Sequence, residues 1–303
     1  MRILVVGAGA VGGYFGGRLL EAGRDVTFLL RPARAAQLAA TGLAIRSPHG
    51  DVSLAAPHCL VGEVASAFDV VVLSCKAPAL AGAVEAMAPA VGEGGVVLPL
   101  LNGMAHLDVL DARFGAGRVL GGECLISATL DDAGRVVHLN RAHTLLFGER
   151  DGARTARADA IAAAFEGAGF DGRRSDAIVQ EMWEKWVFIA SLAGITCLMR
   201  ASVGAIAAAG GTGLALALLD ECAAVASAHG FAPRAKAMER ARAMLAEPGS
   251  AMTASMLRDV EGGAATEGEH VLGDLLRRAE PGTAPLLAIA CTHLRAYEAR
   301  RGA

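Results

Sequence analysis

Lysine is rare in this chain, and two of its lysines occupy positions where a proton donor could act. Among 28 basic residues only three are lysines, namely Lys76, Lys185 and Lys236. Arginine serves wherever a fixed positive charge is enough, but its guanidinium cannot readily release a proton. A lysine that this arginine-rich chain retains is therefore a candidate for acid–base chemistry.

Lys185 stands at the beginning of a helical run that is apolar on all sides. It is followed by 14 residues without a charge, and at 3.6 residues per turn it shares a face with Phe188 and Ile189. Burial beside such a face disfavours the ammonium form and lowers the pKa of a lysine, which suits a proton donor near neutral pH. The plainer interpretation is an ion pair between Lys185 and Glu181, four residues before it.

A cofactor site is predicted at the beginning of the chain. The apolar run at residues 1–6 predicts a buried strand, a helical pattern follows, and between them lies a Gly-x-Gly-x-x-Gly motif made of Gly7, Ala8, Gly9, Ala10, Val11 and Gly12. The first glycine permits a tight turn, the second lets the backbone approach a pyrophosphate, and the third lets the helix pack closely on the strand. These six residues are predicted to bind a dinucleotide. The alternative is a glycine-rich turn that holds nothing.

Arg31, at the end of the second predicted strand, indicates which dinucleotide is bound. An NAD site carries Asp or Glu about 20 residues past the glycines, where it accepts a hydrogen bond from the ribose. This chain has Arg31 there, followed by Arg34, and no acid lies between Val26 and Arg34. Arginine suits a 2′-phosphate, so we predict NADP(H) as the cofactor. A solvated surface arginine is the other interpretation.

Two further polar residues follow buried strands. Lys76 follows the predicted strand at residues 68–75, and Asn102 follows the one at 95–101. Ligands of open α/β sheets gather at the carboxyl ends of the strands, so Lys76 and Asn102 are candidates for the same site as the glycine loop. Asn102 is followed by glycine, so a simple turn is the alternative there.

The order of the elements indicates two domains. Strands and helices alternate in the first part, which includes a hairpin at 43–54, helices at 33–41, 79–90 and 155–168, and short, partly antiparallel strands at 118–130, 135–139, 144–148 and 169–175. Only helices are expected afterwards, at residues 177–199, 212–229, 233–246, 266–279 and 284–301. The fold class is α/β: a Rossmann-type dinucleotide-binding domain over residues 1–174, then an all-helical substrate and catalytic domain over 175–303.

Composition argues against several classes of protein. The net charge is −3 and the pI about 6.2, so no nucleic-acid partner is expected. The six cysteines show no Cys-x-x-Cys spacing, which favours free thiols in the cytoplasm and no metal site. Residues 201–219 carry no charge but are mostly alanine and glycine, so a buried helix pair is expected and not a membrane span. The glycine spacing argues against a signal peptide at residues 1–12.

Taken together, these motifs resemble the ketopantoate reductase family (2-dehydropantoate 2-reductase). The resemblance covers nearly the whole chain and also includes the segments Leu101–Met104, Trp183–Lys185, Ser255–Asp259 and Thr266–Glu267. It implies NADPH-dependent reduction of a small 2-keto acid to a 2-hydroxy acid, a role in pantothenate biosynthesis, and allows a homodimer. The implied catalytic residues are Lys185, as general acid, and Glu267. The implied substrate-binding residues are Asn102, Lys185, Ser255 and Glu267, and Lys76 is placed beside the nicotinamide.

The chain departs from the family pattern at two positions. The family places asparagines four and eight residues after the catalytic lysine, whereas this chain has Ile189 and Ala193. Apolar side chains at these two positions cannot hydrogen-bond a substrate hydroxyl, so the site does not require the substrate to carry one. A more apolar 2-keto acid is therefore an alternative substrate. Ordinary helix capping is the plainer interpretation of the segment around Glu267, because Thr266 and Glu269 match a capping box in which Glu269, and not Glu267, is the acid. A non-catalytic NADP(H)-binding sensor of the same fold is the alternative to an enzyme.

Overall fold

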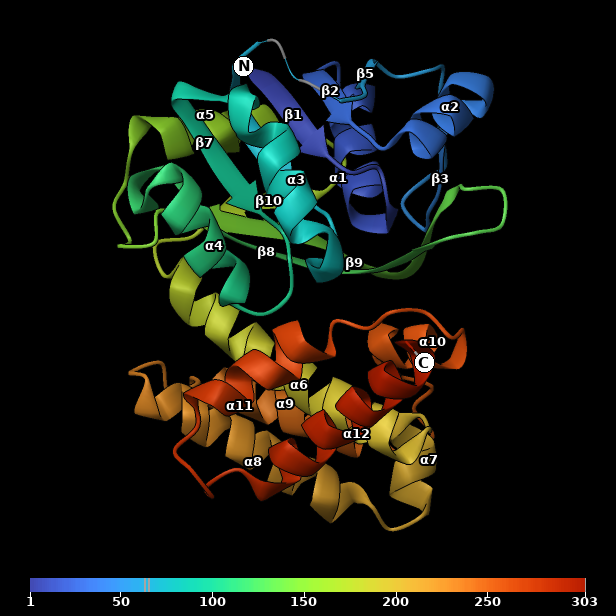
Figure 1. Ribbon diagram of the computed structural model, residues 1–303, viewed down its shortest axis with the longest axis vertical. Coiled ribbons are helices and arrows are strands. Elements are labelled where there is room, and N and C mark those ends of the chain that lie inside the picture. Colours follow the sequence, from blue (N-terminus) through green and yellow to red (C-terminus); the bar gives the residue numbers. More distant parts are fainter. Residues whose placement is uncertain (63, 65, 303) are drawn as a thin grey trace. The chain divides into compact units, whose positions relative to one another are not determined.

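The chain divides into two compact units in the computed structural model, which describes residues 1–62, 64 and 66–302 (Figure 1). The first unit comprises Met1–Leu101 and His106–Val179. The second comprises Asn102–Ala105 and Gln180–Ala303. The first is an α/β unit and the second is helical, so the predicted fold class is confirmed.

A parallel sheet forms the centre of the first unit. Its strand order is β5-β2-β1-β6-β7, and its strands are β1 (Arg2–Val6), β2 (Asp25–Leu29), β5 (Cys59–Leu60), β6 (Phe68–Leu73) and β7 (Val91–Pro99). All residues of β1 after Arg2 are buried, as expected for a strand covered on both faces. The carboxyl ends of β2, β1 and β6 are consequently neighbours.

A second, mixed sheet completes this unit. It has the order β10-β9-β3-β4, with β8 paired to β9, and consists of β3 (Leu43–Arg46), β4 (Val52–Leu54), β8 (Gly121–Leu130), β9 (Val136–Gly148) and β10 (Asp171–Arg174). The hairpin predicted at 43–54 is confirmed by the antiparallel pairing of β3 and β4. The two strands predicted at 135–139 and 144–148 are one strand, because a register shift in the β8–β9 pairing accommodates the break in alternation.

Helix α1 packs against strands of both sheets, and its glycines permit this. The helices of the first unit are α1 (Ala10–Glu21), α2 (Pro32–Thr41), α3 (Leu80–Met87), α4 (Ala105–Phe114) and α5 (Ala156–Phe165), with short 3₁₀ turns η1 (Ala77–Ala79), η2 (Ala88–Ala90) and η3 (Ala116–Arg118). A Cβ atom on Gly16 would lie 2.7 Å from the Phe28 ring in one sheet, and one on Gly17 would lie 2.7 Å from Ile45 in the other. The helical glycines therefore allow close packing on the strands.

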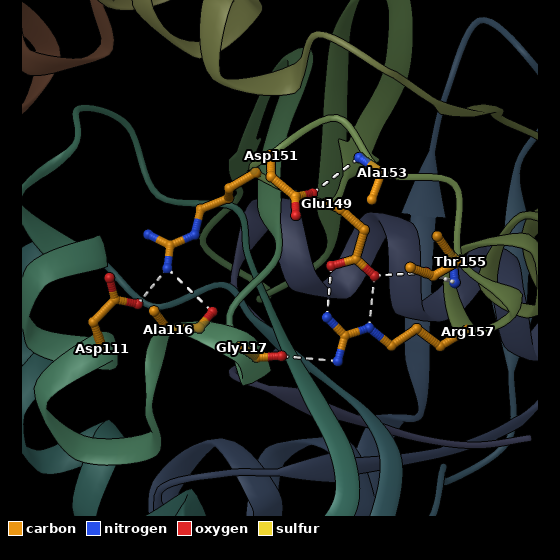
Figure 2. Close-up of polar contacts among 10 residues, drawn as sticks. Asp111, Ala116, Gly117, Glu149, Asp151, Ala153, Thr155 and Arg157 are labelled. Carbon is orange, nitrogen blue, oxygen red and sulfur yellow. Dashed lines mark hydrogen bonds and ion pairs between the residues drawn. The ribbon is translucent and has the colours of Figure 1, made fainter.

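A buried carboxylate joins the end of β9 to α5 (Figure 2). Glu149 accepts two hydrogen bonds of 2.6 Å from Arg157 and one of 2.6 Å from Thr155, the N-cap residue of α5. Arg157 also donates to the Gly117 carbonyl at 2.8 Å. These bonds hold the pKa of Glu149 below its usual value, with the Arg157 hydrogen bond as the main cause. This network stabilises the fold of the first unit.

The second unit consists of helices. They are α6 (Ile178–Met199), α7 (Val203–Ala208), α8 (Thr212–Ala228), α9 (Ala235–Ala246), α10 (Ser255–Glu261), the π-helical turn η4 (Glu269–Gly273), α11 (Asp274–Arg278) and α12 (Pro285–Gly302). The helix predicted at 266–279 is confirmed over residues 268–278, but its first part, Glu269–Gly273, is a π-helical turn that continues directly into α11. The short helix α10 was not predicted, since seven residues are too few for a clear period. Helix α7 and the first part of α8 correspond to the helix pair expected at residues 201–219.

The long apolar segments belong to these helices. The uncharged run at 201–219 is divided between α7 and the first part of α8, so it is not one long helix. Among the described residues, only α6 has the length and composition of a membrane span, and 67% of the tested window is buried within the protein. Helix α6 is thus mostly a core helix of the second unit.

Candidate functional site

The glycine loop forms a tight cradle at the carboxyl end of β1. Gly7 has a φ of +95°, which favours glycine, and its N–H donates to the Leu29 carbonyl at 3.0 Å. The Ser74 hydroxyl donates to the carbonyls of Val6 and Gly7 at 2.9 and 3.0 Å. A Cβ atom on Gly12 would overlap both the Gly7 carbonyl and Ser74 Oγ. The loop can therefore adopt this shape only with glycine at its first and third motif positions.

The N-terminus of α1 suits a phosphate group. Gly9 caps the helix without any side-chain hydrogen bond, and no acidic residue lies in the first turn. A Cβ atom on Gly9 would meet nothing within 4 Å, so the backbone of this residue faces open space. Free N–H groups and the positive end of the helix dipole attract anions. The residues present consequently fit a dinucleotide pyrophosphate.

Arg31 and Arg34 have different surroundings. Arg31 is exposed at the beginning of α2 and makes no side-chain hydrogen bond or ion pair within the part of the chain that the structure describes. Arg34 donates to the Ala8 carbonyl at 2.9 Å, to Gln37 at 2.6 Å and to the Gly134 carbonyl at 2.9 Å. Burial lowers the pKa of Arg34. Arg34 thus supports the glycine loop, while Arg31 is the arginine with its guanidinium in solvent.

Lys76 lies at the carboxyl end of β6, next to the glycine loop. It is exposed and precedes η1, the 3₁₀ turn at Ala77–Ala79. Strands β2, β1 and β6 are adjacent and parallel, so Arg31, the glycine loop and Lys76 all follow the carboxyl ends of neighbouring strands. The candidate cofactor residues of the first unit are therefore brought together.

Lys185 lies in the first half of α6 and does not make the ion pair with Glu181. Glu181 instead lies 3.9 Å from Arg234, and its other carboxylate oxygen is buried without a hydrogen bond. Lys185 makes no hydrogen bond or ion pair with any residue in the described ranges. Glu184 accepts two bonds of 2.7 Å from the Arg234 guanidinium, which anchors the beginning of α9. The interpretation of Lys185 as the ion-pair partner of Glu181 is therefore wrong.

Glu267 lies two residues before the π-helical turn, and the predicted capping box there is wrong. The N–H and hydroxyl of Thr266 both donate to Glu298 on α12, each at 2.7 Å. Glu269 instead forms ion pairs with Arg295 and with Arg277, the latter at 3.2 Å. The acid that bonds the Thr266 N–H thus comes from a distant helix, which sequence spacing cannot indicate. The side chain of Glu267, just before the turn, is half-buried.

Asn102 belongs to the second unit and lies beside the same turn. It does not close a hairpin, because the chain bends at Asn102 and Gly103 and then enters α4. Gly103 has a φ of +77°, and a Cβ atom on it would lie 2.9 Å from the His270 carbonyl oxygen. The backbone of Asn102 also interacts electrostatically with the His270 side chain. Burial is the main influence on His270 and lowers its pKa.

Ser255 begins α10, which is tied to the far end of α6. The N–H of Ala254 donates to Thr196 Oγ1 at 3.4 Å, and Thr196 is fully buried. Ile189 and Ala193 lie on α6 between Lys185 and Thr196, and Ala193 is only 3% exposed. The structure thus places Asn102, Lys185, Ser255 and Glu267 in the second unit, on elements connected by direct hydrogen bonds or contacts.

Three residues of this part escaped the sequence analysis, namely Trp186, His270 and Val271. Trp186 donates its indole N–H to the Val271 carbonyl at 2.8 Å. A tryptophan beside Lys185 and a histidine three residues after Glu267 are the only signals that could have drawn attention to them. No group of three or more His, Cys, Asp or Glu suited to a metal occurs among the described residues, and the six cysteines, all described, form no disulfide.

Comparisons with known proteins cover both units. Family models described as "Ketopantoate reductase PanE/ApbA" and its C-terminal part match residues 3–152 and 177–298. The chain is 44% identical over 208 residues to the "Uncharacterized oxidoreductase YkpB" of Bacillus subtilis, over 69% of this chain and 68% of that protein. A crystal structure of 2-dehydropantoate 2-reductase from Geobacter metallireducens is 30% identical, with a TM-score of 0.88 over 98% of this chain and 99% of that one. A D-mandelate dehydrogenase with NADH and anilino(oxo)acetate shares the fold, with a TM-score of 0.89 at 20% identity over the whole of both chains.

Proposed function

The chain belongs to the ketopantoate reductase PanE/ApbA family of oxidoreductases, and from this premise we propose that it reduces a small 2-keto acid to the 2-hydroxy acid with NADPH. Membership confirms the predicted family. The activity itself rests mainly on one observation, which is that Lys185 has no ionic partner among the described residues, since Glu181 lies by Arg234. An amine on a largely buried helix without a structural partner suits a general acid.

In the proposed reaction, the reduced nicotinamide, when bound, supplies a hydride for the keto carbon. The carbonyl oxygen then gains negative charge, and Lys185 Nζ stabilises this charge and donates a proton to that oxygen. The product is the 2-hydroxy acid, and Lys185 regains its proton from solvent. Glu267, Ser255 and Asn102 are proposed to bind and orient the substrate, as the family resemblance implies.

The first unit is proposed to hold the cofactor. Its glycine loop and the N-terminus of α1 would bind the pyrophosphate, and Arg31 would bind the 2′-phosphate of NADPH. The exposed guanidinium of Arg31 supports this assignment, because Arg34 is engaged by Ala8, Gln37 and Gly134. Lys76 is proposed to lie beside the nicotinamide. A D-mandelate dehydrogenase of the same fold is described with NADH, so the preference for NADPH rests on Arg31.

The substrate is proposed to be more apolar than ketopantoate. Ile189 and Ala193 stand on α6 at the positions where the family pattern has asparagine, and neither can bond a substrate hydroxyl. A wall without polar groups does not penalise a substrate that lacks the hydroxyl. A role in pantothenate biosynthesis would require ketopantoate itself.

The absence of disulfides supports a cytoplasmic location, and a homodimer is proposed as the assembly.

The decisive experiment measures NADPH oxidation with a panel of small 2-keto acids. The panel should include ketopantoate and its analogue without the terminal hydroxyl. We expect turnover of at least one 2-keto acid, with kcat/KM for the analogue equal to or above that for ketopantoate. NADPH binding without turnover of any panel member would instead indicate a non-catalytic NADP(H) sensor.

A further inference from the structure

The π-helical turn at Glu269–Gly273 is a meeting point in the second unit. π-Helical turns are rare and interrupt the regular α-helical ladder, and they occur frequently at functional sites. This turn begins two residues after Glu267, and the Val271 N–H donates to the Glu267 carbonyl at 2.9 Å. Val271 therefore fixes the backbone from which the Glu267 side chain extends.

The same residue also bonds α6. The Trp186 indole N–H donates to the Val271 carbonyl at 2.8 Å, and this donor and acceptor lie on residues that are 0% and 2% exposed. Neither group can exchange its partner for water, so the bond is directional and costly to break. Trp186 directly follows Lys185. One hydrogen bond consequently connects the side chain of the residue next to Lys185 to the turn whose Val271 N–H bond is accepted by Glu267.

The surroundings hold both members of this bond in place. The Arg278 guanidinium lies 5.5 Å from the centre of the Trp186 ring. Helix α6 also approaches the turn closely at Gly194, where a Cβ atom would lie 3.6 Å from Leu272. Glu269 pairs with Arg277 and Arg295 and so ties the turn to α11 and α12.

We propose that Trp186 is a positioning residue, which holds Lys185 in register with Glu267 through the bond from its indole to the Val271 carbonyl. The proposal rests on the proposed function, in which Lys185 donates the proton while Glu267 orients the substrate. Proton transfer needs the donor and the acceptor oxygen within hydrogen-bond reach, and a displacement of about 1 Å can cost on the order of 100-fold in rate. Trp186 thus acts through Lys185 and does not itself touch the substrate.

The test removes the indole N–H and keeps an aromatic ring. Trp186→Phe is compared with Trp183→Phe, its matched control one turn earlier on α6. Trp183 is also buried, and its ring stacks on His229 and Phe231 at 5.6 and 5.5 Å. The Trp183 indole makes no hydrogen bond to any residue that the structure describes. Both variants lose ring area, but only Trp186→Phe loses the bond to Val271.

We expect kcat of Trp186→Phe to fall by about 10- to 100-fold, with less than about a threefold change in the NADPH Kd. Trp183→Phe should keep kcat within about threefold of wild type, although both variants melt at lower temperatures. All rates are measured well below the melting temperature of each variant. A purely structural role of Trp186 would lower the melting temperature and leave kcat near wild type, which would overturn the proposal.

A second arm covers the case in which Trp186→Phe does not fold. In the Trp183→Phe background, Trp186 is the only remaining tryptophan, so biosynthetic replacement by benzothienylalanine exchanges its N–H for sulfur while keeping the ring shape. The same fall in kcat is expected, and unchanged turnover would refute the inference. If the wild type turns over keto acids and depends on Lys185, but kcat of Trp186→Phe is unchanged, this inference is refuted and the proposed function stands. A wild-type enzyme without any turnover refutes the proposed function and the inference with it.

Discussion

Replacing Gly9 by alanine should separate cofactor binding from folding. Gly9 has a φ of −76°, which alanine adopts without strain, and a Cβ atom there would meet nothing within 4 Å. The apo protein should therefore keep its free energy of unfolding within about 1 kcal/mol of wild type, because the loss of a glycine N-cap opposes the gain from a stiffer unfolded chain.

NADPH binding should respond differently to this substitution. A methyl group on Gly9 would occupy the space through which the pyrophosphate approaches the N–H groups of α1. Losing one charge-assisted hydrogen bond costs about 1.5–3 kcal/mol, which corresponds to about a 10- to 150-fold increase in the NADPH Kd. Cofactor fluorescence gives the Kd, and urea unfolding of the apo protein gives the stability.

Gly12→Ala is the matched comparison. Its Cβ atom would overlap the Gly7 carbonyl and Ser74 Oγ, so the backbone must shift, at a cost of about 1–3 kcal/mol in the free energy of unfolding. Gly12→Ala should thus weaken both folding and binding, whereas Gly9→Ala should weaken binding alone. A Gly9→Ala protein with the NADPH Kd of wild type would refute the placement of the pyrophosphate at this loop.

Three further predictions concern selectivity and pH. Arg31→Ala should raise the NADPH Kd by about 10- to 150-fold and leave the NADH Kd nearly unchanged in parallel titrations; equal losses would contradict the 2′-phosphate assignment. The double variant Ile189→Asn and Ala193→Asn should raise kcat/KM for ketopantoate by about 10-fold relative to the analogue without the hydroxyl, which is the lower range for one hydrogen bond. A wild type that already prefers ketopantoate would contradict the role given to Ile189 and Ala193. His138 and His143 have lowered pKa values, chiefly because of burial. The unfolded chain therefore binds protons at these two groups more readily than the folded protein does, so the stability that they contribute should be present above about pH 6.5 and be lost as the pH falls toward their lowered pKa values. Urea unfolding at a series of pH values should show a smaller fall when both are replaced by glutamine.

Local backbone requirements were the most predictable part of the molecule. The glycine loop could be predicted because Gly7 needs a positive φ and Gly12 needs contact with backbone, and both requirements depend on a few neighbouring residues. Strand β1 and residues 70–73 of β6 were equally clear, since continuous apolar runs are typical of a buried parallel sheet. The helical second unit followed from the period of its long helices.

The features that the sequence did not reveal depend on side chains from distant parts of the chain, which replace the partners expected from local spacing. Spacing offered an ion pair between Glu181 and Lys185 as the alternative role of Lys185, but Arg234, more than 50 residues away, lies beside Glu181 instead. Spacing also predicted Glu269 as the capping acid of Thr266, but Glu298 accepts that N–H from another helix. A local pattern contains no information about a distant side chain that binds more favourably.

The π-helical turn was unpredictable for a related reason. Residues 266–279 have the composition of an ordinary helix, and the five-residue turn depends on bonds from other elements. Trp186 supplies one of these bonds, and the ion pairs of Glu269 supply others. Because these partners come from α6, α11 and α12, only the folded structure indicates where the helical ladder is interrupted.

The most direct test of the central claim is the turnover of Lys185→Arg. Arginine keeps the positive charge but cannot readily release a proton, and its wider guanidinium does not fit the same space. With the best 2-keto acid of the panel, kcat should fall by at least about 100-fold, while the NADPH Kd stays within about threefold of wild type, because the residues proposed to bind the phosphates of the cofactor lie in the first unit. Lys185→Arg with a kcat near that of wild type would contradict the account, because the proton would then have to come from another group.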